Sequence, residues 1–349
     1  MKKSLIALLV ATLPAAAFAD VTIYGKIKGG VEYNDNGVTK QTNIDDLGSR
    51  IGFKGTEDLG NGLKTIWQVE TGFAIDGNKD QYSKSSSGTF ANRNSFIGLQ
   101  GGFGTVRLGN VSNFLDSDMG TVDTWEYNSD ALGLSIFTRD GVRLKNSVRY
   151  DLPTVVPGLT AAIQYGTKED KTTGSQDRET SVVGLGYENS GFFGKYAYTH
   201  QSKASTTNSY KANDKHRLEV GYNANNLFVG LGYQQEKGGY DVVGWNNYVA
   251  ASFTNVSIKP TDDVKTQEVA LTAGYTFGAI TPKFTYAHAN NVKVNGVSIS
   301  NTKYDQYVLG ADYAISKRTT FGAQYGQIAV KGTGNKDLKS FGLNMVHAF

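Results

Sequence analysis

Lysine and arginine side chains recur at alternate positions within apolar segments of the chain. Near the N-terminus, Lys26 and Lys28 alternate with Gly25 and Ile27. Because successive side chains of a β-strand point to opposite faces, the two lysines share one face and the apolar residues share the other. The same alternation places five more basic side chains opposite apolar ones: Arg50, Lys54, Lys64, Arg107 and Arg149. A wall of fixed positive charges can attract and orient anions without making or breaking a bond.

A block of carboxylates follows in the long polar connection from Asn110 to about Val142. This connection supplies Asp116, Asp118, Asp123, Glu126 and Asp130. Like charges gathered on one wall repel unless negative groups lie opposite them, so we expect the connection to face the basic residues. The two charged surfaces would then create a transverse field that orients hydrated solutes. The alternative, an exposed acidic loop that touches nothing, stays open at this point.

Residues that could support catalysis or metal binding lack the required spacing. The stretch Asp116-Ser117-Asp118-Met119-Gly120 is similar to the start of a calcium-binding loop, but Tyr127 stands where that loop needs a bidentate glutamate. The histidines show no metal-ligand spacing, and the sequence has no cysteine; the histidines are His200, His216, His288 and His347. Nucleophile-elbow and phosphate-loop patterns are absent as well. We therefore expect no catalytic residue, no metal and no cofactor.

The segments that must position these charges read as repeated hairpins. Alternating runs joined by a turn of a few residues occur in VVGLGYENSGFFGKYAYTH from Val182 and in LEVGYNANNLFVGLGYQQ from Leu218. We count seven short turns that alternate with eight long polar connections, the first of which we place at Asn34 to Asp46. Fifteen connections imply 16 strands, an even number as in bacterial single-chain barrels. Short turns at one end and long loops at the other are typical of such barrels.

The first 19 residues have the features of a secretory signal peptide. Lys2 and Lys3 precede the apolar run from Leu5 to Val10, and Ala17-Phe18-Ala19 provides a small-x-small cleavage site. A membrane-anchor helix would need about 20 apolar residues, whereas a proline interrupts this segment. We predict a signal peptide over residues 1–19 and a single domain over 20–349. Without the two lysines, 33 basic residues face 32 acidic ones, so we expect no nucleic-acid partner.

The composition, with 42 glycines, 20 tyrosines and 17 phenylalanines, fits either a soluble all-β protein or a closed transmembrane barrel. In a soluble sandwich, long strands with apolar outer faces would present edges that aggregate. In a barrel, the apolar face meets lipid, the basic face meets water, and closure pairs every backbone group. We therefore predict an all-β fold, a 16-stranded antiparallel transmembrane β-barrel. The C-terminal FGLNMVHAF would close it by pairing with VTIYGKIKGGVEY.

Five segments are informative when they are taken together: DVTIYGKIKGGVEY, SRIGFKGTEDLGNGLKTIWQVE, NRNSFIGLQGGFGTVRLG, NSVRYDLP and the terminal HAF. In combination they resemble the neisserial-type major outer-membrane porins of the Gram-negative porin family. The resemblance implies a homotrimer of 16-stranded barrels, each with a water-filled pore that is narrowed by the third long loop folded inward. It adds Arg93, which matches the third segment, to the basic pore wall. It also implies that the barrel-assembly machinery reads the terminal aromatic residue, Phe349.

These observations predict a general diffusion porin of the bacterial outer membrane, through which small hydrophilic solutes and ions pass passively. The predicted constriction loop carries Asp116, Asp118, Asp123 and Glu126, and the predicted basic pore wall comprises Lys26, Lys28, Arg50, Lys54, Lys64, Arg93, Arg107 and Arg149. Because basic residues outnumber acidic ones there, we expect weak anion selectivity. The expected partners are further copies of the chain, outer-membrane lipid and lipopolysaccharide, the barrel-assembly machinery, and the permeating solutes and ions.

Other functional classes remain open from the sequence. A substrate-specific sugar channel should show a ladder of lumen-facing aromatic residues, whereas most aromatic residues here fall on the predicted outer face. A barrel lipid hydrolase would need a Ser–His pair on the lipid-facing rim. An adhesin is a further alternative.

Overall fold

The structure, a computed structural model, describes residues 20–77, 90–127, 129, 131–139, 141–169, 177–203, 211–239, 259, 261–331 and 336–349. The predicted signal peptide at 1–19 and Asp130 lie outside the described residues. Within the described part of the chain, no helix is long and apolar enough to cross a membrane.

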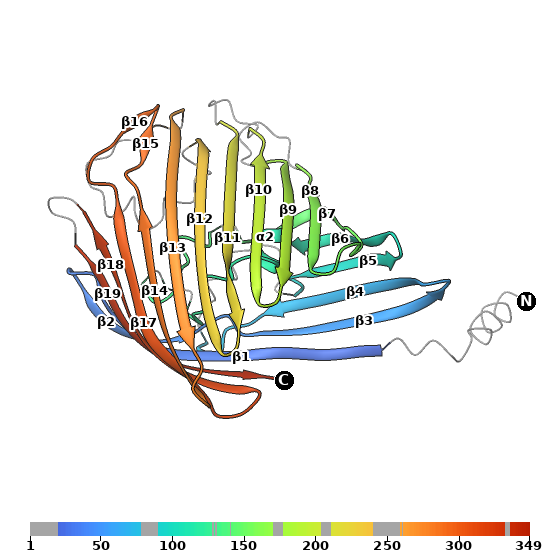
Figure 1. The fold of residues 1–349 in the computed structure, drawn as a ribbon, viewed down its shortest axis with the longest axis horizontal. Helices are drawn as coiled ribbons and strands as arrows, with labels where there is room; N and C mark the ends of the chain where they lie inside the picture. The colour runs from blue at the N-terminus through green and yellow to red at the C-terminus, as the bar shows by residue number, and fades with distance from the viewer. Residues whose placement is uncertain are drawn as a thin grey trace, which may run out of the picture.

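The strands follow one another along the chain as a series of hairpins (Figure 1). Their bounds are β1 (Asp20–Asp35), β2 (Lys40–Asp46), β3 (Arg50–Gly60), β4 (Leu63–Gly72), β5 (Ser95–Gly101), β6 (Gly104–Ser112), β7 (Arg143–Asp151), β8 (Leu159–Gly166), β9 (Thr180–Asn189), β10 (Phe192–Gln201), β11 (Asn213–Ala224), β12 (Leu227–Gly239), β13 (Asp263–Tyr275), β14 (Ile280–Ala289), β15 (Lys293–Val294), β16 (Val297–Ser298), β17 (Tyr304–Ala314), β18 (Thr319–Val330) and β19 (Leu338–Ala348). A short helix, α2 (Phe114–Ser117), lies between β6 and β7.

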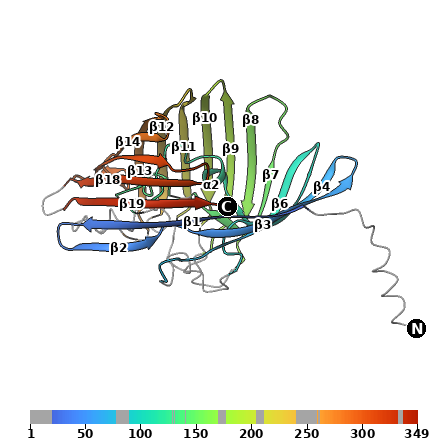
Figure 2. The same cartoon turned by 90° about the horizontal axis from the view of Figure 1, so that it is seen from below.

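All the strands belong to one antiparallel sheet that closes on itself. β1 pairs with β19, with Lys28 opposite Val346, and both views of the ribbon place the first and last strands side by side (Figures 1 and 2). β2 and β3 both pair with β1 and form two halves of one barrel strand, while β15 and β16 form a small hairpin within a connection. The 19 strands found in the described residues therefore make 16 barrel strands. The predicted closed, 16-stranded antiparallel barrel is confirmed.

One predicted long connection, from Asn34 to Asp46, is wrong. β1 continues to Asp35 and β2 begins at Lys40, so most of this stretch is a hairpin. The reason lies in the four residues between the strands, where the Asn36 side chain accepts hydrogen bonds from the backbone N–H groups of the residues two and three positions later, at 2.9 and 2.8 Å. An asparagine that bonds its own turn in this way allows a tight reversal in a polar stretch.

Side chains alternate between a polar interior and an apolar exterior. On β11, Lys215, Arg217 and Glu219 are buried inside the barrel, whereas Leu218 and Val220 are exposed on its outside. Transfer of apolar surface from water to hydrocarbon is favourable by about 25 cal/mol for each Å². The exposed apolar side chains are therefore more stable in contact with lipid than with water. The exterior therefore suits the interior of a membrane, and the lumen suits water.

The segment of residues 113–142, between β6 and β7, folds into the barrel, and we call it the inner loop. Its neck is closed by Asn113, whose backbone N–H donates to the carbonyl of Val142 at 2.9 Å. The Asn113 side chain also accepts a hydrogen bond from the N–H of Asp116 at 2.9 Å and caps helix α2. Phe114 then packs against β9 at Gly184, where a Cβ atom would lie only 2.0 Å from the ring. The predicted inward-folded loop is confirmed.

The inner loop is fastened to the seam between the first and last strands by Tyr127. Its hydroxyl lies 3.0 Å from the carbonyl oxygen of Val31 on β1 and 2.8 Å from that of Leu343 on β19. Two glycines make room for the ring, because a Cβ atom at Gly30 would lie 2.3 Å from the Tyr127 hydroxyl and one at Gly342 would lie 2.8 Å from the ring. The seat for Tyr127 therefore consists of both strands of the seam.

On the opposite side of the barrel, Arg139 fastens the end of the inner loop. Its guanidinium pairs with Glu236 of β12, at 3.1 Å, and with Glu268 of β13. The backbone carbonyl of Arg139 accepts hydrogen bonds from Lys215 at 2.9 Å and from Arg217 at 2.7 Å, both on β11. Breaking a buried ion pair by removing one partner leaves an uncompensated charge, which is strongly destabilising. These contacts hold the loop across the lumen.

The C-terminal residue contributes to closure, and its removal should impair assembly. The backbone of Phe349 exchanges two hydrogen bonds with Gly25, at 3.0 and 3.1 Å, and its ring covers that glycine on the outer face. We predict that Phe349→Ser lowers the amount of folded barrel in the outer membrane severalfold, whereas the neighbouring Ala348→Ser has little effect. Outer-membrane levels and heat-modifiable migration measure this. Equal levels for the two variants would contradict it.

Loss of the Tyr127 hydroxyl should loosen the inner loop without abolishing the barrel. A buried hydrogen bond contributes about 1 kcal/mol net, so Tyr127→Phe should lower the free energy of unfolding by about that amount. It should also increase the noise of the open-channel current. The control is Tyr33→Phe, because Tyr33 is exposed on the outer face of β1. If both variants unfold at the same denaturant concentration and give equal noise, Tyr127 does not hold the loop.

Candidate pore constriction

Two carboxylates of the inner loop pair with basic residues of the barrel wall. The Lys28 ammonium on β1 lies 2.8 Å from a carboxylate oxygen of Glu126. The Arg149 guanidinium on β7 lies 2.8 Å from Asp118 and 2.7 Å from Asp151, and only 3% of its side chain is exposed. Alternation along the strands sets these inward directions, and the capped start of the inner loop brings Asp118 to the wall. The loop and the wall are thus joined by opposite charges.

A group of three arginines, one on each of β3 and β7 and one in the connection before β5, gathers around two carboxylates. Arg93 pairs with Glu70 at 2.6 Å, and Arg50 lies 3.8 Å from the same carboxylate. Arg143 lies 3.6 Å from Asp116 of the inner loop. The side chains of Arg50 and Arg143 are 27% and 24% exposed, so both can reach water in the lumen. Three guanidinium groups against two carboxylates leave local positive charge.

Arg107 of β6 lies directly opposite Arg149 of β7. It pairs with Asp151 at 2.8 Å and stacks over the ring of Phe96, with its guanidinium carbon 5.4 Å from the ring centroid. Ile97 is 59% exposed on the outer face, so Phe96 is the residue that points inward. This settles the facing of β5, where the alternation alone is ambiguous.

Of the remaining predicted wall residues, Lys26 lies within electrostatic reach of Glu126 in the inner loop, whereas Lys54 and Lys64 lie nearer the short turns. Lys26 sits opposite Arg50 in the register of β1 and β3, on the same face. The Lys54 ammonium lies 5.3 Å from the centroid of the Tyr24 ring. Lys64 is exposed and lies opposite Asp58, beside the turn between β3 and β4. The structure therefore does not bring Lys54 and Lys64 together with the groups that hold the inner loop.

Asp123 lies inside the inner loop rather than against the basic wall. Its carboxylate accepts hydrogen bonds from the backbone N–H groups of Trp125 and Leu134, at 3.3 and 3.2 Å. Burial raises the pKa of the Asp123 carboxyl to about 6, although these hydrogen bonds and the charges of Lys283 and Lys28 lower it. Its geometry is that of a group that shapes the loop. A carboxylate bonded to nearby backbone cannot be told from a solvated one by sequence alone.

Sequence reasoning missed several charged residues on the far wall. Glu219 on β11 accepts the backbone N–H groups of Gly120 and Thr121, at 3.0 and 2.8 Å, and so fixes the middle of the loop. Lys283 on β14 pairs with Asp312 at 2.7 Å and lies 4.4 Å from the centroid of the Trp125 ring. The signal was present, because the rule that finds the first basic wall also finds Lys215, Arg217 and Glu219 at alternate positions.

The arrangement can attract, orient and pass charged solutes in water. Its groups are ion pairs and hydrogen bonds between a wall and a loop, with unequal numbers of positive and negative charges. Among the described residues, no group of three or more His, Cys, Asp or Glu side chains is placed to hold a metal ion.

Comparisons with known proteins agree with this geometry. A sequence model described as Gram-negative porin matches residues 4–333. The chain is 41% identical, over 331 residues, to the major outer membrane protein P.IB of Neisseria meningitidis serogroup B, serotype 15, and the match covers 92% of this chain and 91% of that protein.

Solved structures share the fold. An anion-selective porin from Comamonas acidovorans superimposes with a TM-score of 0.73 at 22% identity, over 95% of this chain and 100% of that one. In vitro folded OmpT from Vibrio cholerae, in its trimer form, superimposes with a TM-score of 0.67 at 14% identity, over 95% of this chain and 99% of that one. On its barrel, its inward loop and its extensive sequence identity, the chain belongs to the Gram-negative porin family of the outer membrane.

Proposed function

We propose that this outer-membrane diffusion porin passes small hydrophilic solutes with a weak preference for anions. The observation that carries the proposal is the group of Arg50, Arg93 and Arg143 around only two carboxylates, Glu70 and Asp116. In a narrow water path bounded by walls of low dielectric constant, such local charges matter more than the net charge of the protein. Anions should therefore enter the constriction more readily than cations.

The preference is proposed to be weak because neighbouring charges largely compensate one another. Lys28 is paired with Glu126, and Arg107 and Arg149 share Asp151, with Asp118 also paired to Arg149. With Asp123 turned into the inner loop, the excess of positive charge rests mainly on the three arginines and on Lys26, which lies opposite Arg50. The porin of Comamonas acidovorans, which is described as anion-selective, supports the same sign.

We further propose that transport is passive and that the barrel performs no catalysis. The outward-facing histidines have partners that differ from the serine a lipid hydrolase would need. His200 bonds to Asp214, His216 to Tyr196, His288 to Asp305 and His347 to Thr319. A substrate-specific channel is not favoured, because many of the aromatic side chains, such as Tyr187, Tyr196 and Phe284, are exposed on the outer face of the barrel.

The proposed partners of the barrel follow from its place in the outer membrane. We propose a homotrimer, which the trimer form of OmpT supports. We also propose that residues 1–19 are a cleaved signal peptide, that the barrel-assembly machinery reads Phe349, and that lipopolysaccharide surrounds the outer face. Each of these extends the family assignment to interactions of this chain.

The selectivity can be tested by neutralising Arg50 and Arg143, whose side chains are more exposed than that of Arg93 in the same group. Arg50→Gln with Arg143→Gln should shift the reversal potential in a potassium chloride gradient toward that of a cation-preferring pore. The shift should shrink at high salt, because the screening length falls to about 3 Å at 1 M. Planar-bilayer recording measures it.

The matched control is Lys317→Gln with Arg318→Gln, which removes the same charge from the short turn between β17 and β18. The control should leave the reversal potential unchanged. A wild-type pore that already prefers potassium over chloride would overturn the proposed sign. A shift of equal size in the control would overturn the assignment to the arginines.

The homotrimer predicts a characteristic behaviour in detergent. Unheated protein should migrate in sodium dodecyl sulfate at the size of a trimer and shift to the monomer position on boiling, because the closed sheet resists the detergent until it is heated. Chemical cross-linking should trap species of up to three chains. A folded barrel that migrates and cross-links only as a monomer would contradict the proposal.

A further inference from the structure

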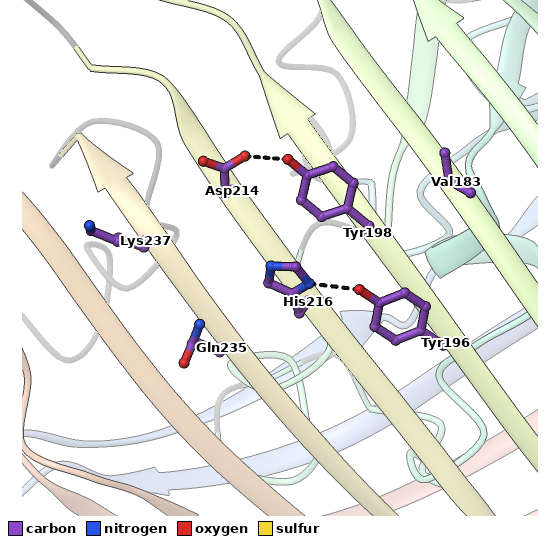
Figure 3. A pocket seen from close by; sticks show the side chains of 7 residues that line it. All are labelled: Val183, Tyr196, Tyr198, Asp214, His216, Gln235 and Lys237. Atoms are coloured by element: carbon purple, nitrogen blue, oxygen red, sulfur yellow. Dashed lines mark hydrogen bonds between the residues drawn. The ribbon is translucent and has the colours of Figure 1, made fainter.

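The outer face of strands β9 to β12 has a polar hollow. Elsewhere the outer face of the barrel is mostly apolar. Figure 3 shows its lining, which consists of Val183, Tyr196, Tyr198, Asp214, His216, Gln235 and Lys237. All of these side chains lie on the outward face, since their neighbours Lys215, Arg217 and Gln234 are buried in the lumen. The hollow therefore opens toward the membrane and has no access to the pore.

Hydrogen bonds between neighbouring strands hold the side chains of the hollow in place. Tyr198 donates to Asp214 at 2.6 Å, and the Tyr196 hydroxyl lies 2.7 Å from Nδ1 of His216, as the dashed lines in Figure 3 indicate. His200 also bonds to Asp214, at 2.8 Å. Rings fixed in this way lose little conformational entropy when they bind a ligand. The hollow is a preorganised surface.

A row of lysines borders the hollow at the end of the strands that carries the long connections. Lys237 of β12 lies directly opposite Lys265 of β13, which in turn lies directly opposite Lys293 of β15. Like charges at directly opposite positions of a sheet are destabilising. Among the described residues, the nearby carboxylates are Asp263, 3.3 Å from Lys237, and Asp214, which faces Lys237 across β11 and β12 but already bonds to His200. Three ammonium groups against these two carboxylates favour an anionic ligand.

The row lies at the depth of lipid headgroups. Below it on the outer face are Leu218, Leu231 and Val269, which are exposed to the membrane. Tyr198 lies opposite His216, between Leu218 and the lysine row, and Tyr196 lies opposite Leu218 itself. Tyrosines mark the boundary between hydrocarbon and water. The lysines sit at the end of the strands that carries the long connections, which in bacterial barrels is the extracellular end. The headgroups beside them are therefore those of the outer leaflet.

We propose that the hollow and the lysine row bind the phosphorylated sugar headgroup of a glycolipid in the outer leaflet. Lys237 and Lys265 donate hydrogen bonds to the phosphate, and Gln235 and Asp214 bind sugar hydroxyls. The acyl chains then run along Val183 and the leucines below the tyrosines. A free phosphate would meet only the lysines, whereas a lipid also uses the rings and the apolar strip. The inference rests on the proposed contact between the barrel and lipopolysaccharide.

The experiment uses the refolded full-length barrel in detergent, with purified bisphosphorylated lipid A as the probe and native mass spectrometry as the readout. Lys237→Gln with Lys265→Gln should weaken retention of lipid A about tenfold, because basic side chains near a membrane surface supply much of the attraction to anionic lipid. Lys317→Gln with Arg318→Gln, at the opposite end of the barrel, should leave it unchanged. Enzymatically dephosphorylated lipid A should bind the wild-type barrel as weakly as lipid A binds the double variant.

Three outcomes would overturn the proposal. They are equal retention by the two double variants, equal binding of phosphorylated and dephosphorylated lipid A, and full displacement of lipid A by excess inorganic phosphate, which would indicate a site for free phosphate. Heat-modifiable migration verifies that the variants fold. Conductance and reversal potential of Lys237→Gln with Lys265→Gln should match those of the wild type, so failure of the lipid site is distinguishable from failure of the proposed pore function.

Discussion

In the hydrocarbon of a membrane, an unpaired backbone N–H or C=O group has no water to bond with, and each one costs several kcal/mol. The pairing of β1 with β19 satisfies this constraint, because it removes the two edges that an open sheet of these strands would have. The alternation of side chains depends on that closure, since it separates a lumen from an exterior. Charged residues can then collect on one face without meeting lipid.

The closed wall also explains why the inner loop can carry charge. Residues 113–142 leave the sheet and would expose their own backbone groups if the wall did not receive them. Glu219 accepts two of their N–H groups, and Lys215 and Arg217 donate to the carbonyl of Arg139. The loop is therefore held on both sides by side chains whose directions the strands determine. The arginines around Glu70 and Asp116 gain their positions from the same framework.

Most of the barrel could be predicted from the sequence because strands have a period of two and closure requires an even count. Lys28 and Arg149 point inward for that reason, and the same rule reaches Lys215 and Arg217 on β11, a strand that the prediction passed over. The inner loop has no regular alternation of side chains, so the sequence does not predict where each of its side chains points. Asp123 and Asp118 are both acids of one polar stretch, yet one bonds to backbone inside the loop and the other pairs with Arg149. The hairpin at Asn34 to Asp46 was not predicted either, because strands that extend past the membrane into water are polar and resemble loops in composition.

The seat of Tyr127 has a consequence for the order of events during biogenesis. Its two acceptor carbonyls, on Val31 and Leu343, come from opposite ends of the chain, and the glycine beside each one completes the slot. One strand alone offers only one carbonyl and one glycine, so the complete slot exists only after the first and last strands have paired. Tyr127 can therefore dock only after the sheet has closed, whereas the contacts of Arg139 with β11 to β13 do not involve the seam. A docked Tyr127 therefore marks a completed wall.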